Sequence, residues 1–252
     1  MIQYKSEEDI LKIKKSGQIL HDVLEELKQI VKPGVEATVL DQKAYDLIKE
    51  KGGDPAFLGY MPYGARSGFP NTICLSINEE VVHGTCYPGK VVKDGDVVSV
   101  DCGVILDGYY SDSAFTVIAG KGSERDIHMV NVCRESLNRA IEACKIGNTL
   151  GDVGYSINSY VEKNGFTTIK DLVGHGVGFD LHEEPEVLNY GKPKEGLVLK
   201  EGMVIAIEPM ITYSTSYVRE GRNNAYITED LSPSAHFEHT VAITKNGPLI
   251  LT

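Results

Sequence analysis

Two aspartates, Asp101 and Asp112, interrupt a stretch that otherwise reads as two apolar β-strands, VVSVDCGVILDGYYSDSAFTVI over residues 97–118. Between them, Asp107-Gly108 is a strong signal for a type I′ hairpin turn. Such a turn aligns Asp101 with Ala114 and puts both carboxylates on one face of the hairpin, roughly 7 Å apart at Cα. Like charges at this spacing repel unless a cation lies between them, although a solvent-facing polar edge is the simpler alternative.

An internal repeat predicts a second arrangement of the same kind. Residues 32–52 align without gaps on residues 145–165. Each copy reads as the end of a helix, a glycine break and an amphipathic helix closed by a glycine. Each copy also follows a segment with apolar residues at helical spacing, residues 6–31 and residues 123–144.

The repeat continues into the expected strands. KDGDVVSVD aligns with KEGMVIAIE, which matches Asp101 to Glu208, and YYSDSAFTV aligns with AHFEHTVAI, which matches Asp112 to Glu238. Four carboxylates at equivalent strand positions predict a pseudo-two-fold site where two antiparallel hairpins meet. Two divalent cations would neutralise such a site. Ordinary similarity between amphipathic segments is the alternative explanation of the repeat.

Three histidines extend this candidate site. In DLVGHGVGFDLHEEPEV, residues 171–187, His175 lies between two glycines after an expected apolar strand, and His182 is followed by two glutamates. His83 also precedes a glycine. A lone histidine is more often structural than a ligand, but histidines beside glycines and acids favour a metal site here. Oxygen ligands with one imidazole nitrogen suit Mn²⁺, Fe²⁺, Co²⁺ or Zn²⁺.

Several motifs resemble the bacterial type I methionine aminopeptidases: VDCGVILDGYYSDSAFT, GHGVG with HEEP, IEPMI and SAHFEHT. The resemblance covers about residues 6–250. It implies an α+β pita-bread fold, a curved antiparallel sheet with two pseudo-symmetric helix pairs on its outer face. It also implies a single catalytic domain over residues 1–252, with halves of about 1–120 and 121–252.

The same resemblance implies an aminopeptidase that removes the N-terminal methionine from peptides and nascent proteins. A water or hydroxide bridging two divalent metal ions, Co, Mn, Fe or Zn, would be the nucleophile. Asp101 would bind one metal, Asp112 and Glu238 would bridge both, and His175 and Glu208 would complete the shell of the other.

Further roles follow from the resemblance. Glu208 would shuttle the proton, His182 would hold the substrate and stabilise charge in the tetrahedral intermediate, and His83 would contact the peptide near the leaving nitrogen. The methionine pocket should be apolar and narrow, although plain core packing is a serious alternative for each candidate. By position, its candidates are Phe57, Tyr60, Phe69, Cys74 and Leu181.

Three departures from the family pattern concern the pocket and not the metal ligands. The loop at residues 61–74 is longer than usual in the family. The connection between Glu208 and Glu238 contains no tryptophan, and the whole chain has none. Leu181 stands where an aromatic residue is common. These differences alter the expected shape of the pocket and its rim.

Composition excludes several other classes. The chain has 252 residues, 42% of them hydrophobic, and a formal charge of −11, which argues against non-specific nucleic-acid binding. The sequence has no run long and apolar enough for a membrane span, and its charged N-terminus predicts no signal peptide. Five cysteines without a CxxC pair favour reduced thiols and a cytoplasmic protein. The resemblance implies a monomer and contact with the ribosome, for which the chain has no motif.

Two rival functions use the same fold. An Xaa-Pro aminopeptidase or prolidase would share all five ligands, but such enzymes usually carry an additional N-terminal domain. A non-catalytic binding protein would have lost metal ligands, whereas all five are present here. Type II methionine aminopeptidases carry a helical insertion for which the second half is too compact.

Overall fold

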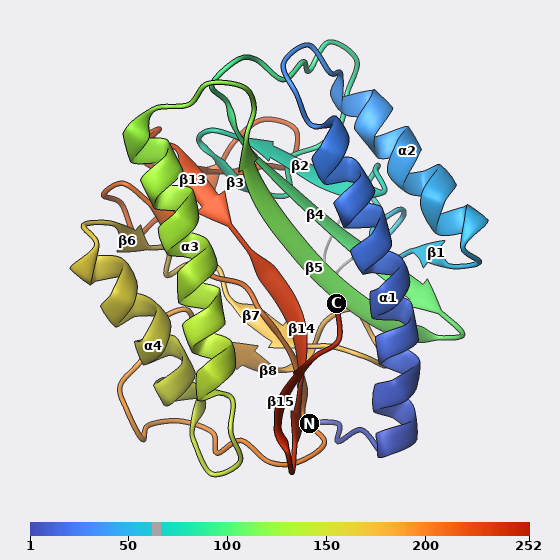
Figure 1. The fold of residues 1–252 in the computed structure, drawn as a ribbon, viewed down its shortest axis with the longest axis vertical. Coiled ribbons are helices and arrows are strands. Elements are labelled where there is room, and N and C mark those ends of the chain that lie inside the picture. The colour runs from blue at the N-terminus through green and yellow to red at the C-terminus, as the bar shows by residue number, and fades with distance from the viewer. Residues whose placement is uncertain (62–66) are drawn as a thin grey trace.

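A computed structural model describes residues 1–61 and 67–252. In this part of the chain, four helices lie as two pairs against one face of a curved antiparallel sheet (Figure 1). The expected α+β pita-bread architecture is confirmed. The helices are α1 (Glu7–Ile30), α2 (Ala37–Glu50), α3 (Glu124–Ala143) and α4 (Leu150–Lys163).

The helix ends explain why the two pairs are alike. The Ser6 side chain accepts a hydrogen bond from the Asp9 amide and caps α1, and Ser123 caps α3 in the same way. Gly52 and Gly165 follow α2 and α4 with φ of 82° and 79°, a backbone conformation that favours glycine. None of the described helices is long and apolar enough to cross a membrane.

The main sheet contains nine strands in the described residues, with a central path β1-β4-β5-β14-β9-β7-β8. Strand β2 pairs with β4, and β15 pairs with β14. Its strands are β1 (Asp54–Pro55), β2 (Ile73–Ile77), β4 (Val97–Leu106), β5 (Tyr109–Ile118), β7 (Gly174–Gly176), β8 (Glu183–Val187), β9 (Val204–Ile207), β14 (Glu238–Thr244) and β15 (Gly247–Ile250).

Two smaller sheets of three strands each complete the described chain, in the orders β13-β10-β6 and β11-β12-β3. Their strands are β3 (Glu80–Val82), β6 (Thr167–Thr168), β10 (Met210–Thr212), β11 (Val218–Glu220), β12 (Tyr226–Thr228) and β13 (Ser234–His236).

The first hairpin has the predicted register. Asp107 and Gly108 have φ of 50° and 81°, as a type I′ turn requires. Asp101 lies opposite Ala114, and Gly103 lies opposite Asp112. The turn residues therefore fix both carboxylates on one face of β4 and β5, as the sequence predicts.

The second pair of strands differs from the expected hairpin. Strands β9 and β14 are antiparallel neighbours, but residues 208–237 separate them and form strands of both smaller sheets. Strand β14 also pairs with β5, with Glu238 opposite Ala114. The two halves therefore meet along β5 and β14. The antiparallel pairing expected for the second pair of strands is confirmed, but a long connection and not a turn joins them.

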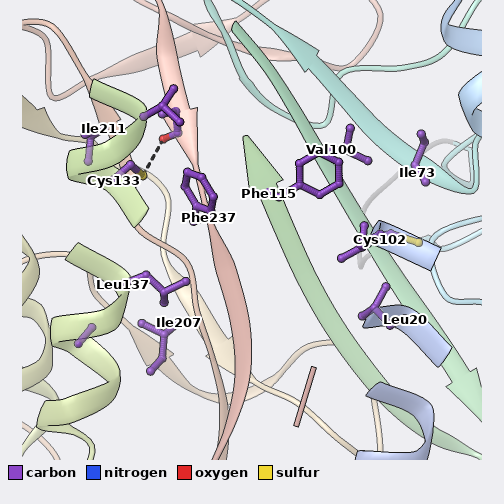
Figure 2. Close-up of a cluster of buried hydrophobic side chains, with 14 of the residues drawn as sticks. Leu20, Ile73, Val100, Cys102, Phe115, Cys133, Leu137, Ile207, Ile211 and Phe237 are labelled. Atoms are coloured by element: carbon purple, nitrogen blue, oxygen red, sulfur yellow. Dashed lines mark hydrogen bonds between the residues drawn. The ribbon is translucent and has the colours of Figure 1, made fainter. Parts of the chain in front are cut away.

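Both halves share one hydrophobic core between the helices and the sheet (Figure 2). Leu20 of α1 and Phe115 of β5 belong to one half, and Leu137 of α3 and Ile207 of β9 belong to the other. Burying these side chains removes apolar surface from water and presses the helices onto the sheet. This packing leaves the opposite face of the strands free to carry polar groups.

Candidate metal centre

Four carboxylates from the two halves converge on one buried site. Asp101 and Asp112 come from β4 and β5, Glu238 begins β14, and Glu208 directly follows β9. They line a cavity of about 1030 Å³. The arrangement brings together all four acids that the repeat predicted.

His175 joins the carboxylates from the neighbouring strand. Its Nε2 lies 3.6 Å from Glu208 Oε1 and 3.9 Å from Asp112 Oδ2. Its Nδ1 lies 2.9 Å from the Gly176 carbonyl oxygen, to which it can only donate. The Nε2 lone pair is therefore free to bind a metal. His175 lies within β7, whereas the sequence predicted a strand over the preceding residues 171–173.

Burial raises the pKa of every carboxyl group in this cluster. The pKa of Asp101 and that of Glu208 are each raised to about 7, mainly because burial penalises the charged form. The pKa values of Asp112 and Glu238 are raised well above normal by burial and by the neighbouring carboxylates. In the part of the chain that the structure describes, none of the four pairs with a lysine or arginine.

These residues fit a bound cation. Asp101 Oδ1, Asp112 Oδ1 and Glu238 Oε1 are buried and have no hydrogen-bond partner among the described residues. Buried polar atoms are nearly always satisfied, so their lack of partners points to a ligand. Ligand atoms of Asp112, His175 and Glu238 all lie within 4.8 Å of one another. Oxygen donors with one imidazole nitrogen suit a divalent transition metal.

Hydrogen bonds behind the site hold the ligand strands in register. The Asp112 amide donates to Thr240 Oγ1 over 3.0 Å, and Thr240 Oγ1 donates to the Asp112 carbonyl oxygen over 2.8 Å. Ser113 Oγ donates to the Glu238 carbonyl oxygen over 2.8 Å. The Asn189 side chain donates to the Glu208 carbonyl oxygen over 2.9 Å. Three of the carboxylates are therefore fixed through their own backbone.

His182 lies beside the ligand cluster. Its ring centroid is 4.4 Å from that of His175 in an edge-on arrangement. Its Nδ1 lies 2.6 Å from the Tyr60 hydroxyl oxygen. Partial desolvation of the ring within the cavity, together with His175, lowers the pKa of His182, so the ring is neutral at physiological pH. Burial raises the pKa of Tyr60, which keeps its hydroxyl proton available for donation.

His83 also lines the cavity. It follows β3 with φ of 59°, an unusual conformation for a non-glycine residue, and its ring packs edge-on against Tyr226 at 5.6 Å. Burial lowers the pKa of His83, so this imidazole is also neutral. The cavity therefore presents two neutral histidines that are not members of the ligand cluster.

An apolar recess adjoins the histidines. Phe57, Cys74 and Leu181 are buried in one hydrophobic cluster, and Tyr60 and Phe69 pack against it. All five side chains line the cavity. The structure thus brings together the five pocket candidates of the sequence. Part of the long loop expected over residues 61–74 lies outside the described residues, at positions 62–66.

His236 is a site residue that the sequence interpretation missed. It is buried, and its Nε2 lies 3.5 Å from Glu208 Oε2 with no hydrogen-bond partner among the described residues. A signal was available, because residues two apart in extended chain share a face and His236 precedes Glu238 by two. His175 faces the other oxygen of Glu208, so the Glu208 carboxylate lies between two imidazoles.

We expect His236→Leu to lower the rate of a metal-dependent reaction at this site by about tenfold. Side chains that contact a metal-binding carboxylate typically contribute that much to activity. His236→Gln retains an N–H donor and should lose less. Steady-state rates of the two variants at saturating metal would measure this difference. Equal rates for wild type and His236→Leu would show that the imidazole does not act on Glu208.

The fold and the site together define a metal-dependent hydrolase. Residues 11–245 match the model of metallopeptidase family M24, and the chain belongs to this family. It is 47% identical to a methionine aminopeptidase of Aquifex aeolicus, covering 100% of this chain and 98% of that protein. It is 43% identical to methionine aminopeptidase 1 of Bacillus subtilis, covering 100% and 99%.

Solved structures are similar over the same length. The methionine aminopeptidase of Thermotoga maritima superimposes with a TM-score of 0.95 at 43% identity, covering 100% of this chain and 99% of that one. The prolidase of Pyrococcus furiosus has a TM-score of 0.77 at 27% identity, and only 65% of its chain is covered. The prolidase alternative is therefore not favoured.

Proposed function

We propose that this chain is a methionine aminopeptidase that removes the N-terminal methionine from peptides and nascent proteins. One observation carries the proposal: a buried cluster of carboxylates, three of whose oxygen atoms have no hydrogen-bond partner among the described residues, lies beside an apolar recess in a member of family M24. The full-length relatives at 43% and 47% identity bear the name of this activity. Residues 1–252 would form one catalytic domain.

Two divalent ions, of Co, Mn, Fe or Zn, would be held by five side chains. Asp101 would bind one ion, Asp112 and Glu238 would bridge the pair, and His175 and Glu208 would complete the other site. Bound cations supply a water of lowered pKa and polarise the scissile carbonyl group. The support is the oxygen-rich ligand set and the free Nε2 of His175.

Glu208 would accept a proton and return it to the leaving amine. Each of its two oxygens faces an imidazole, Oε1 toward His175 and Oε2 toward His236. The Asn189 amide fixes its backbone. The carboxylate can therefore serve as a ligand and still keep one oxygen for proton transfer.

His182 would donate a hydrogen bond to the carbonyl oxygen of the scissile bond. A neutral imidazole has one acceptor nitrogen, and we assign the Tyr60 hydroxyl, 2.6 Å from Nδ1, as the donor to that nitrogen. The proton then lies on Nε2, where it can stabilise the charge that develops on the substrate oxygen. His83, also neutral, would contact the peptide near the leaving nitrogen.

Tyr60→Phe tests this tautomer assignment. Without the hydroxyl, the proton of His182 is free to shift to Nδ1, so we expect kcat to fall by about tenfold. The apolar ring is retained, so the KM for methionine peptides should change little. A variant with unchanged kcat would rule out Tyr60 as the group that sets the tautomer.

The methionine side chain would occupy the recess formed by Phe57, Tyr60, Phe69, Cys74 and Leu181. A thioether is polarizable and adapts to an aromatic-lined pocket. We also infer a monomer in the cytoplasm that meets nascent chains at the ribosome, as the family role implies.

The deciding experiment is removal of metal with a chelator, followed by reloading with Mn²⁺ or Co²⁺. Cleavage of Met-Ala-Ser and of Ala-Pro-Ser would be timed side by side. Metal-restored release of methionine from the first peptide alone supports the proposal. Preferential cleavage of Ala-Pro-Ser would move the assignment to prolidase, and no cleavage of either with no metal retained would leave a binding protein.

A further inference from the structure

The loop between β7 and β8 carries two residues of the proposed site. Within residues 177–182, Leu181 forms a wall of the apolar recess and His182 faces the ligand cluster. The contacts of Leu181 and His182 with the site are made by their side chains. The positions of both side chains therefore depend on the contacts that fix the backbone of the loop on its side away from the site.

Glu183 organises the loop through its side chain. Its Oε1 accepts hydrogen bonds from the amides of Phe179 and Asp180, over 2.6 Å and 3.1 Å. The carboxylate is buried, with 2% of its side chain exposed. Its other oxygen, Oε2, pairs with the ammonium group of Lys5. One carboxylate thus closes the turn and attaches it to a distant part of the chain.

Lys5 belongs to the segment that precedes α1, and only 1% of its side chain is exposed. Its amide donates to the Gly202 carbonyl oxygen over 2.7 Å, next to β9. Its Nζ also donates to the Gln3 carbonyl oxygen over 3.1 Å and lies 5.1 Å from the centre of the Phe179 ring. Lys5 therefore contacts the loop in two ways, through its ion pair with Glu183 and through the aromatic ring of Phe179.

The loop also packs closely against the lysine stem. Gly178 has φ of 141°, and a Cβ built there would lie 2.7 Å from Ile13 Cδ1 and 2.9 Å from Lys5 Cε. On the other side, the Tyr110 amide donates to the Gly178 carbonyl oxygen over 2.8 Å. The chain at Gly178 is thus held between α1, Lys5 and the central hairpin.

We propose that Lys5 and Glu183 are positioning residues that hold Leu181 and His182 in place for the reaction. The N-terminal segment, through Lys5, would then contribute to the geometry of the site. This inference rests on the proposed function. A buried ion pair is weak evidence of stabilisation, because desolvation offsets its attraction, but a fully hydrogen-bonded pair specifies one geometry. Lys5 does not line the cavity, whereas Glu183 lines it next to His182.

The proposal predicts a selective defect. Asp101, Asp112, Glu208 and Glu238 lie on or beside other strands. His175 lies on β7, whose backbone pairing with β8 and β9 does not involve the side chain of Glu183, so loss of the ion pair should leave metal binding intact. Displacement of His182 should lower kcat, and displacement of Leu181 should weaken the preference for methionine over leucine at the first residue. A purely structural role for the pair would change neither this preference nor the environment of the His182 ring.

The test compares Lys5→Met, Glu183→Gln and the double variant, which leaves no buried charge unpaired. For Lys5→Met we expect kcat/KM on Met-Ala-Ser to fall by about 10- to 100-fold. The ratio of Met-Ala-Ser to Leu-Ala-Ser cleavage should fall too, with Co²⁺ affinity by calorimetry unchanged. Lys5→Arg keeps the charge and should recover part of the loss. In ¹⁵N spectra, the His182 ring should shift and the His83 ring should not.

Two controls separate position from stability. Lys245→Met removes an exposed lysine that pairs with Glu7 in the same N-terminal region, and it should change nothing. Leu137→Ala truncates a buried residue of α3 and should lower Tm without altering selectivity. If Lys5→Met does not fold, the double variant and Lys5→Arg supply the same measurements.

The outcomes are distinct for the two proposals. Unchanged selectivity and an unshifted His182 ring in folded Lys5→Met or in the double variant would overturn the positioning role. If Leu137→Ala lost as much selectivity for methionine over leucine as Lys5→Met does, the positioning role would also be overturned. A wild type that does not cleave Met-Ala-Ser would refute the proposed function instead, and the ¹⁵N spectra would still decide whether the pair holds His182.

Discussion

Replacing Asp112 with asparagine is expected to lower peptidase activity by about a thousandfold or more while making the metal-free protein more stable. Asp112 is buried at the meeting point of the two halves, and burial and neighbouring carboxylates raise its pKa well above normal. Asparagine has the same shape without the charge. It removes a group that repels its neighbours when no cation is bound.

The opposite signs of the two effects make the prediction specific. Substitution of a residue with a purely structural role would make the metal-free protein less stable. Substitution of a metal ligand whose buried charge destabilises the fold makes it more stable. We expect the Tm of the chelator-treated variant to exceed that of chelator-treated wild type by roughly 3 °C or more. Scanning calorimetry with and without Mn²⁺ would measure both proteins.

A matched control is Asp126→Asn, which changes a carboxylate of α3 that accepts a hydrogen bond from Tyr213, outside the site. It should lower stability slightly and leave the metal response intact. If Asp112→Asn destabilised the metal-free protein, or if it kept substantial metal-dependent activity, the assignment of Asp112 as a bridging ligand would be wrong.

Local rules were sufficient for the first half of the site. Asp107 and Gly108 can both adopt positive φ, and this turn fixes the register that places Asp101 and Asp112 on one face. The helix pairs were equally predictable, because serine caps and terminal glycines mark their ends. In these elements the information that determines structure lies within a few residues of the feature.

The second half of the site depends on contacts distant in sequence. Strands β9 and β14 are adjacent, although residues 208–237 run through two other sheets between them. The local sequence of neither strand contains that pairing, and the internal repeat and the family resemblance were what indicated that Glu208 and Glu238 belong beside the first two acids. The repeat did not predict how the strands are connected.

Buried polar partners were the least predictable part. Lys5 and Glu183 are 178 positions apart, and an isolated lysine near a chain end usually lies in solvent. His236 lies in the motif SAHFEHT, but the motif does not indicate its role, because its partner Glu208 comes from a distant part of the chain. Ion pairs and ring contacts of this kind follow from the fold and do not reveal themselves in any short pattern.

The second large effect concerns stability and pH in the metal-free protein. The pKa values of Asp101 and Glu208 are raised to about 7, and those of Asp112 and Glu238 are raised further, mainly by burial. A raised pKa means that the folded state keeps protons which the unfolded chain has released. Stability from these groups is therefore present at low pH and is lost as the pH rises through the folded-state pKa values.

The histidines whose pKa is lowered in the folded protein oppose this trend, most strongly below about pH 6.5. Burial lowers the pKa values of His83, His182, His236 and His239, so the unfolded chain binds their protons first as the pH falls. These imidazoles become nearly neutral in both states only well above the pKa of the unfolded chain, so their opposing slope fades between about pH 6.5 and pH 7.5. The window for the measurement is pH 7 to 8, where the remaining histidine slope and the onset of cysteine ionisation in the unfolded chain affect the metal-free and the metal-loaded protein alike.

Within that window we expect the Tm of chelator-treated protein to fall by roughly 3 °C or more as the pH rises. The metal-loaded protein should lack this fall, because a bound cation favours the ionised carboxylates. The gain in Tm on metal binding should thus increase with pH, since fewer protons compete for the ligands. In Asp112→Asn the slope of the metal-free protein should be shallower. A metal-free Tm that rises from pH 7 to 8 would contradict the conclusion that ionisation of these four carboxyl groups destabilises the protein when no cation is bound.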